Sequence, residues 1–144
     1  MIRVLIVDDS PTSAQLLNEL FLAAGDFDVV GCATSGSEAL TLCARLQPDI
    51  VSMDVLMSDQ NGFEVTRQIM AQYPVPIVIV SAEADDQLGS LSHRAQAAGA
   101  LGALSKPRVS TARDLAHHRE ELLFTFRAMA GVKVVRRRAS SAAP

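Results

Sequence analysis

Three carboxylates, one hydroxyl and one ammonium group each follow closely on a short apolar run of the chain. The residues are Asp8, Asp9, Asp54, Ser81 and Lys106. Short, continuously apolar runs are typical of strands that are buried on both faces of a parallel sheet. The carboxyl ends of parallel strands meet at one edge of the sheet, where ligands bind in open α/β folds. We therefore expect these five side chains to converge at that edge.

Convergence of this kind is poorly explained by ordinary structural roles. Taken alone, Asp9 is more simply a helix cap, Ser81 a turn residue and Lys106 a solvated surface residue. Three carboxylates that are brought together repel one another, so one of them must be protonated unless a cation is present. Carboxylate oxygens with positions left for water suit Mg²⁺. The group therefore predicts Mg²⁺ held by Asp8, Asp9 and Asp54.

The same group of residues predicts phosphoryl transfer. This reaction needs an in-line nucleophile and fixed positive charge around the phosphoryl oxygens, and little else from the protein. Asp54 can be the nucleophile and form an acyl phosphate. Lys106 can pair with one phosphoryl oxygen as a compact cation, and Ser81 can donate a hydrogen bond to another.

Five apolar runs alternate with segments of helical periodicity. The runs span residues 2–7, 28–33, 50–53, 77–80 and 100–104. This alternation predicts right-handed βαβ crossovers with helices on both faces of a parallel sheet. Five strands in a chain of this length match the flavodoxin-like (βα)5 winding, a doubly wound sandwich with strand order 2-1-3-4-5.

Local signals place the five helices between and after these runs. The signals are Ser10, Pro11 and Gly25 around the first helix, Ser35 with Glu38 at the second, Asn61 before the third and Gly99 after the fourth. We expect the fourth helix to span about residues 85–98. The expected buried stripes are Val65, Ile69 and Tyr73 on the third helix and Leu115, Leu122, Phe126 and Met129 on the fifth.

The composition is that of a globular domain, with 49% hydrophobic and 20% charged residues in a chain of 144. No apolar run is long enough to span a bilayer, and the chain begins with a strand-like segment where a signal peptide would stand. We therefore expect a cytoplasmic protein with no membrane partner. Cys32 and Cys43 are expected to be reduced and packed.

Four short motifs resemble the receiver domain of two-component response regulators, a CheY-like fold. They are VLIVDDS at residues 4–10, DVLM at 54–57 with Gly62, VSA at 80–82 and KP at 106–107. The resemblance implies that Asp9 and Asp54 ligate Mg²⁺ directly and Asp8 directly or through water. It also implies that the backbone carbonyl of Leu56 is a ligand and that a phosphohistidine of a sensor kinase is the phosphodonor.

Three further segments, 62–70, 73–81 and 129–137, resemble the CheB family of chemotaxis protein-glutamate methylesterases. In that family an esterase domain follows the receiver, and the kinase is CheA-like. The resemblance implies a receiver domain over residues 1–130 and the start of a basic, flexible interdomain linker over 131–144. No G-x-S-x-G nucleophile motif occurs, so we expect the regulatory part of such a protein, without output catalysis of its own.

The sequence departs from the usual receiver pattern at three positions. Ser58 stands where proline is usual, which should loosen the loop beyond Asp54. Leu56 replaces a residue that is commonly polar, and both of these departures bear on the dephosphorylation rate. Ala103 replaces an aromatic residue that commonly carries the signal to the surface, so we expect phosphorylation to leave the fifth strand nearly unchanged and to reshape residues 57–62 and 83–87.

Three other functions remain open at this point. The receiver can belong to another response regulator, either DNA-binding or stand-alone. The basic run 136–138 alone suits nucleic acid, but no recognition helix or interleaved aromatics accompany it, so we expect no nucleic-acid partner. A Mg²⁺-dependent phosphohydrolase would need a general acid where Leu56 stands. A binding module that is never phosphorylated would be expected to lack one of the acidic residues or Lys106.

Overall fold

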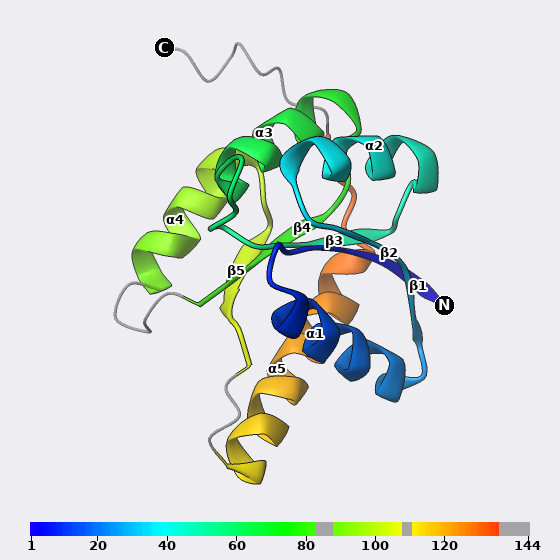
Figure 1. Cartoon of the computed structure of the whole chain (residues 1–144), viewed down its shortest axis with the longest axis vertical. Helices are drawn as coiled ribbons and strands as arrows, with labels where there is room; N and C mark the ends of the chain where they lie inside the picture. Colours follow the sequence, from blue (N-terminus) through cyan, green and yellow to red (C-terminus); the bar gives the residue numbers. More distant parts are fainter. Residues whose placement is uncertain (83–87, 108–110, 136–144) are drawn as a thin grey trace.

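Five parallel strands alternate with five helices in the computed structural model, which describes residues 1–82, 88–107 and 111–135 (Figure 1). The elements are β1 (Ile2–Val7), α1 (Pro11–Ala24), β2 (Phe27–Ala33), α2 (Gly36–Leu46), β3 (Ile50–Met53), α3 (Gly62–Gln72), β4 (Ile77–Ser81), α4 (Leu88–Ala98), β5 (Gly102–Ser105) and α5 (Ala112–Ala130). The strands lie in the order β2-β1-β3-β4-β5. The predicted flavodoxin-like fold and strand order are therefore confirmed.

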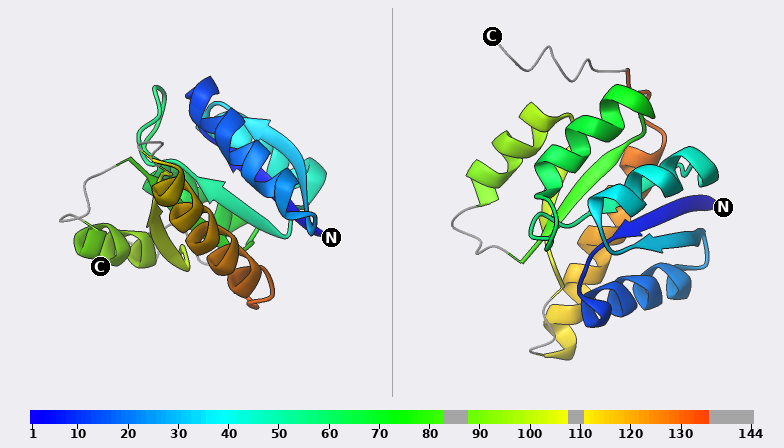
Figure 2. Two further views of the ribbon diagram at one scale, coloured as in Figure 1. Left: turned by 90° about the horizontal axis from the view of Figure 1, so that it is seen from below. Right: turned by 45° about the horizontal axis from the view of Figure 1, so that its top comes forward.

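The sheet lies between two layers of helices. Helices α1 and α5 cover one face, and α2, α3 and α4 cover the other (Figures 1 and 2). Strands β3 and β4 are buried along their whole length, and so are the last four residues of β1. The edge strands β2 and β5 are less buried. This difference explains why the central strands are the most continuously apolar parts of the sequence.

Each face of the sheet has its own apolar core. On the side of α2, α3 and α4 the core includes Val65, Ile69 and Leu91. On the other side the ring of Phe21 from α1 lies 5.0 Å, centroid to centroid, from the rings of both Phe27 and Phe126. These three rings join α1, β2 and α5, and their tilted and edge-on arrangement is the favourable one for aromatic contacts.

Capping residues fix the helix starts where the sequence predicted them. The Ser10 hydroxyl accepts from the Ser13 N–H before α1, and the Ser35 hydroxyl accepts from the Glu38 N–H before α2. Before α3 the Asn61 carboxamide oxygen accepts from two backbone N–H groups of the first turn. Helix α1 ends at Gly25 in the left-handed conformation, with φ of 85°, as expected for a glycine after a helix.

Three details differ from the sequence prediction. Strand β5 begins at Gly102, two residues later than expected. Tyr73 follows the last turn of α3 and is 40% exposed, so it does not extend the buried stripe. Cys32 is exposed because it lies on edge strand β2, whereas Cys43 is buried, and both thiols are free. The predicted start of the fourth helix near residue 85 lies outside the described residues.

Within the part of the chain that the structure describes, no helix has both the length and the apolar character needed to cross a membrane.

The aromatic cluster gives a test of how the C-terminal helix is held. Phe126 is fully buried and Phe124, two residues earlier on the same helix, is 74% exposed. Phe126→Ala should lower the free energy of unfolding by about 3–5 kcal/mol because it removes a buried ring and leaves a cavity. Phe124→Ala should change it by less than about 0.5 kcal/mol. Urea unfolding followed by circular dichroism measures both, and equal effects would contradict the packing described.

Candidate functional site

The carboxylates of Asp8, Asp9 and Asp54 lie together at the carboxyl edge of the sheet. Strands β1 and β3 are parallel neighbours, and Val7 pairs with Met53 at their ends. The Asp54 N–H continues this ladder by donating to the Val7 carbonyl at 2.9 Å. One oxygen from each of the three carboxylates lies within 4.8 Å of the others. The predicted convergence of these three residues is what the structure shows.

Burial makes this cluster unusual for acidic side chains. Asp8 is 1% exposed and Asp54 is 6% exposed, whereas Asp9 is half-buried. The Asp8 Oδ1 atom accepts a hydrogen bond of 2.9 Å from the Ser10 N–H. The buried Asp8 Oδ2 atom has no hydrogen-bond partner. This atom forms an ion pair with Lys106, described next.

The Lys106 ammonium group lies between the two buried carboxylates. Its Nζ atom is 3.0 Å from Asp8 Oδ2 and 3.5 Å from Asp54 Oδ2. Lys106 reaches this position because β5 pairs with β4. The Lys106 N–H also donates to the Ser81 carbonyl at 2.7 Å. Ser81 is buried at the end of β4, beside the lysine along the same edge. Lys106 and Ser81, the other two predicted site residues, therefore also lie at this edge of the sheet.

The site has a marked effect on the acidity of Asp54. Burial raises the pKa of its carboxyl group to about 6 because the charged form loses its hydration. The ammonium group of Lys106 acts in the opposite direction, and the neighbouring Asp8 carboxylate adds to the rise in pKa. Asp54 is thus a carboxylate whose negative charge is poorly compensated by the protein alone.

The loop of residues 54–61, which joins β3 to α3, is held by contacts that the sequence did not reveal. The Ser58 N–H donates to Asp9 Oδ2 at 3.0 Å. The Gly36 N–H, in the first turn of α2, donates to both oxygens of Asp59 at 3.2 and 3.0 Å. Free N–H groups at a helix start require acceptors, but nothing local indicates that Asp59, 23 residues away, supplies one.

Gly62, at the end of this loop, packs closely against the backbone of Asp54 and Val55, just after β3. Its N–H donates to the Val55 carbonyl at 2.7 Å. A Cβ atom at Gly62 would lie 2.0 Å from the Asp54 carbonyl oxygen, which no side chain tolerates. Glycine is therefore required here for space, and the close approach fixes the backbone on which the Asp54 side chain stands.

The residues present fit a hard divalent cation. Three carboxylates supply oxygen ligands, and one of their buried oxygens, Asp8 Oδ2, has no hydrogen bond. An added cation would also favour the ionised form of Asp54, whose pKa is raised mainly by burial and further by the Asp8 carboxylate. The expected role of the Leu56 carbonyl as a metal ligand and the expected hydrogen bond from Ser81 to a phosphoryl oxygen remain predictions.

Residues 4–117 match the family described as the response regulator receiver domain. The chain belongs to this family. The receiver domain is 45% identical over 137 residues to protein-glutamate methylesterase/protein-glutamine glutaminase 3 of Anaeromyxobacter dehalogenans, covering 95% of this chain and 40% of that protein. The chain thus spans well under half the length of that relative.

Solved structures give the same assignment. The response regulator domain of Thermotoga maritima CheB superposes with a TM-score of 0.80 and 31% identity, over 92% of this chain and 98% of that one. A chain in the complex of the P1 domain of CheA3 with CheY6 from R. sphaeroides superposes with a TM-score of 0.75 and 27% identity, over 91% of this chain and 98% of that one. The predicted resemblance to CheB receivers is confirmed.

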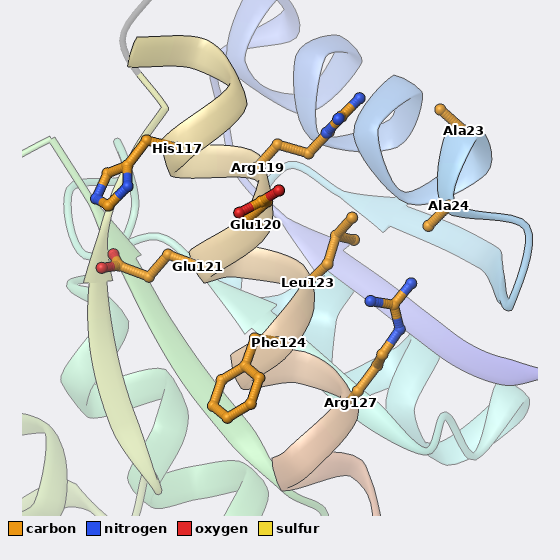
Figure 3. A pocket seen from close by; sticks show the side chains of 9 residues that line it. All are labelled: Ala23, Ala24, His117, Arg119, Glu120, Glu121, Leu123, Phe124 and Arg127. Atoms are coloured by element: carbon orange, nitrogen blue, oxygen red, sulfur yellow. The ribbon is translucent and has the colours of Figure 1, made fainter. Parts of the chain in front are cut away.

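A surface hollow lies elsewhere on the receiver domain. It has a volume of about 720 Å³ and is formed by α5 and the end of α1 (Figure 3). Its lining residues are Ala23, Ala24, His117, Arg119, Glu120, Glu121, Leu123, Phe124 and Arg127. None of the five site residues contributes to it, so this hollow has no part in the chemistry of the acidic cluster.

The raised pKa of Asp54 predicts how stability depends on pH without divalent metal. A carboxyl pKa of about 6 in the folded protein, above the ordinary 3.8, means that folding favours the protonated form. This stabilisation is complete below about pH 4 and is lost as the pH rises through 6. In EDTA, Asp54→Asn should therefore gain stability over the parent between pH 4 and 7, by an amount on the order of 1–3 kcal/mol. Urea unfolding across this range measures the gain, and a constant difference would contradict the assignment.

Proposed function

We propose that this receiver domain accepts a phosphoryl group on Asp54 in a Mg²⁺-dependent reaction. The observation that carries the proposal is the position of the Asp54 carboxylate, buried beside Lys106 and the carboxylates of Asp8 and Asp9. In this setting Lys106 would supply positive charge on one side of the bond that would form, and a divalent cation held by the three carboxylates would supply it on the other. Its backbone is fixed by the ladder to β1 and by the close approach of Gly62.

The residues divide the work of the reaction. One oxygen of Asp54 attacks phosphorus while the leaving group departs on the far side, and an acyl phosphate results. Asp8, Asp9 and Asp54 would hold Mg²⁺, with the Leu56 carbonyl as a further ligand, and the ion would offset charge on the phosphoryl oxygens. Lys106 would leave its ion pair with Asp8 and Asp54 to pair with one phosphoryl oxygen, and the Ser81 hydroxyl would donate to another.

The proposed phosphodonor is a phosphohistidine of a CheA-like sensor kinase. Support comes from the similarity to a chain in the complex of the CheA3 P1 domain with CheY6. The proposed place of action is the cytoplasm, where such a kinase would meet the domain.

The proposed output is a chemotaxis methylesterase domain that would follow a receiver of residues 1–130. This is supported by similarity to methylesterases of which the chain spans 40%. Residues 131–144 would begin the linker, and the structure describes them as far as Val135, with Val134 packed against the core. The proposed basic, flexible character of the linker falls mainly on residues 136–144, outside the described range.

Phosphorylation is tested with a small phosphodonor such as acetyl phosphate in the presence of Mg²⁺. Intact-mass analysis should show one phosphoryl adduct on the parent and none on Asp54→Asn, because the nucleophile is gone. Asp59→Asn is the control, since this carboxylate lies in the same loop but contacts Gly36. An adduct that survives Asp54→Asn would place the chemistry on another residue.

Metal binding is tested separately, by the effect of Mg²⁺ on unfolding. A cation that binds only the folded domain should raise its stability, by about 2.7 kcal/mol at a hundredfold excess over Kd. Asp9→Ala should remove most of this gain because it deletes a ligand. Asp28→Ala, an exposed acidic residue on β2, should retain it. If Asp9→Ala gains as much as the parent, Asp9 is not a ligand.

A further inference from the structure

Asp9 is the most exposed of the three carboxylates of the site. Asp8 and Asp54 are almost fully buried and lie against Lys106, whereas Asp9 is half-buried and stands just before α1. A side chain with this freedom loses rotamer entropy when it binds a metal ion in one orientation. Any contact that already fixes the carboxylate therefore strengthens metal binding.

The structure contains such a contact. The backbone N–H of Ser58 donates to Asp9 Oδ2 at 3.0 Å, across 49 positions of the chain. A carboxylate has two oxygens, and each accepts more than one interaction. A hydrogen bond to one oxygen thus leaves the other available to a cation. Metal-binding carboxylates are generally oriented by hydrogen bonds of this kind, and the loss of such a partner weakens metal affinity.

The donor depends on the residue type at position 58, which is serine. A proline at this position would have no N–H group to donate. Serine at this position was expected to loosen the loop, and the structure adds a contact that this expectation missed. The Ser58 side chain is exposed, so the relevant group is its backbone N–H.

The rest of the loop does not depend on this hydrogen bond. Leu56 and Asn61 form an antiparallel bridge across the loop, and Asp59 is fixed by the Gly36 N–H at the start of α2. Loss of the Ser58 donor should therefore leave the loop in place while it releases the Asp9 carboxylate.

We propose that the Ser58 N–H is a positioning group, which orients the Asp9 carboxylate for Mg²⁺ and links metal occupancy to the conformation of residues 56–59. The inference rests on the proposed metal site. Because coupling is reciprocal, a metal that is favoured by the hydrogen bond must in turn strengthen it.

The test compares Ser58→Pro, which removes the N–H, with Ser58→Ala, which keeps it. The Mg²⁺ concentration that gives half of the maximal thermal stabilisation should rise roughly tenfold in Ser58→Pro and change by less than about twofold in Ser58→Ala. The Mg²⁺ concentration for half-maximal phosphorylation by acetyl phosphate should shift in parallel, and the rate at saturating Mg²⁺ should not. Equal values for the two variants, or tighter binding by Ser58→Pro, would overturn the proposal.

Proline also restricts the backbone of the preceding residue, so this effect must be separated from loss of the donor. The same pair of variants is therefore made in an Asp9→Asn background. If the N–H acts through the Asp9 carboxylate, most of the effect of Ser58→Pro disappears there. If the effect of Ser58→Pro is undiminished there, it arises from the restricted backbone before the proline, and the proposal is overturned.

Amide exchange of the parent protein gives a result that does not depend on folding of the proline variant. Saturating Mg²⁺ should slow exchange of the Ser58 N–H, and Asp9→Ala should remove this protection. Faster exchange with Mg²⁺ would mean that the metal breaks the hydrogen bond, and the inference fails. If the parent shows no response to Mg²⁺ in any assay, the proposed metal site itself fails, which is a different outcome.

Discussion

Repulsion among three carboxylates at one edge of the sheet is the constraint on which the site depends. Lys106 is the cation placed among them, with its Nζ atom 3.0 Å from Asp8 and 3.5 Å from Asp54. With all three acids ionised, three negative charges and one positive charge leave a net charge of −2 at the cluster. The Asp8 carboxylate contributes to the raised pKa of Asp54, for which burial is the largest cause. A divalent cation has the charge that would neutralise the cluster.

The fold supplies this arrangement through strand pairing. Asp8 and Asp54 are neighbours because β1 pairs with β3, and Lys106 reaches them because β5 pairs with β4 on the far side of β3. The apolar residues of the central strands hold the sheet, and the polar residues begin where those strands end. The same hydrophobic burial that stabilises the domain therefore also brings acidic groups together against their repulsion.

Most of the fold and the core of the site could be predicted from the sequence, because buried parallel strands and helix caps leave local signals. The ends of individual helices and strands were harder to predict. Tyr73 continues the helical period, but Pro74 follows it and disfavours a further helical residue. The run that begins at Ala100 is apolar before strand pairing starts at Gly102.

Contacts of the loop between β3 and α3 could not be predicted at all. The Ser58–Asp9 and Asp59–Gly36 hydrogen bonds join positions 49 and 23 residues apart. Each uses a backbone N–H, which every residue except proline has, so the residue types carry no signal of the pairing. Only the path of the loop, fixed by Gly62 and the bridge between Leu56 and Asn61, determines which groups meet.

The aromatic cluster of α1, β2 and α5 has a consequence for how the domain folds as it leaves the ribosome. The core under α2, α3 and α4 draws almost all of its buried residues from the chain up to Ala100. The opposite core needs Phe126, and Arg127 pairs with Asp26 across 101 positions. Synthesis from the N-terminus therefore completes one face of the sheet well before the other. Until α5 emerges, Phe21 lacks the Phe126 ring, and the apolar residues of α1 and β2 on this face stay uncovered by α5.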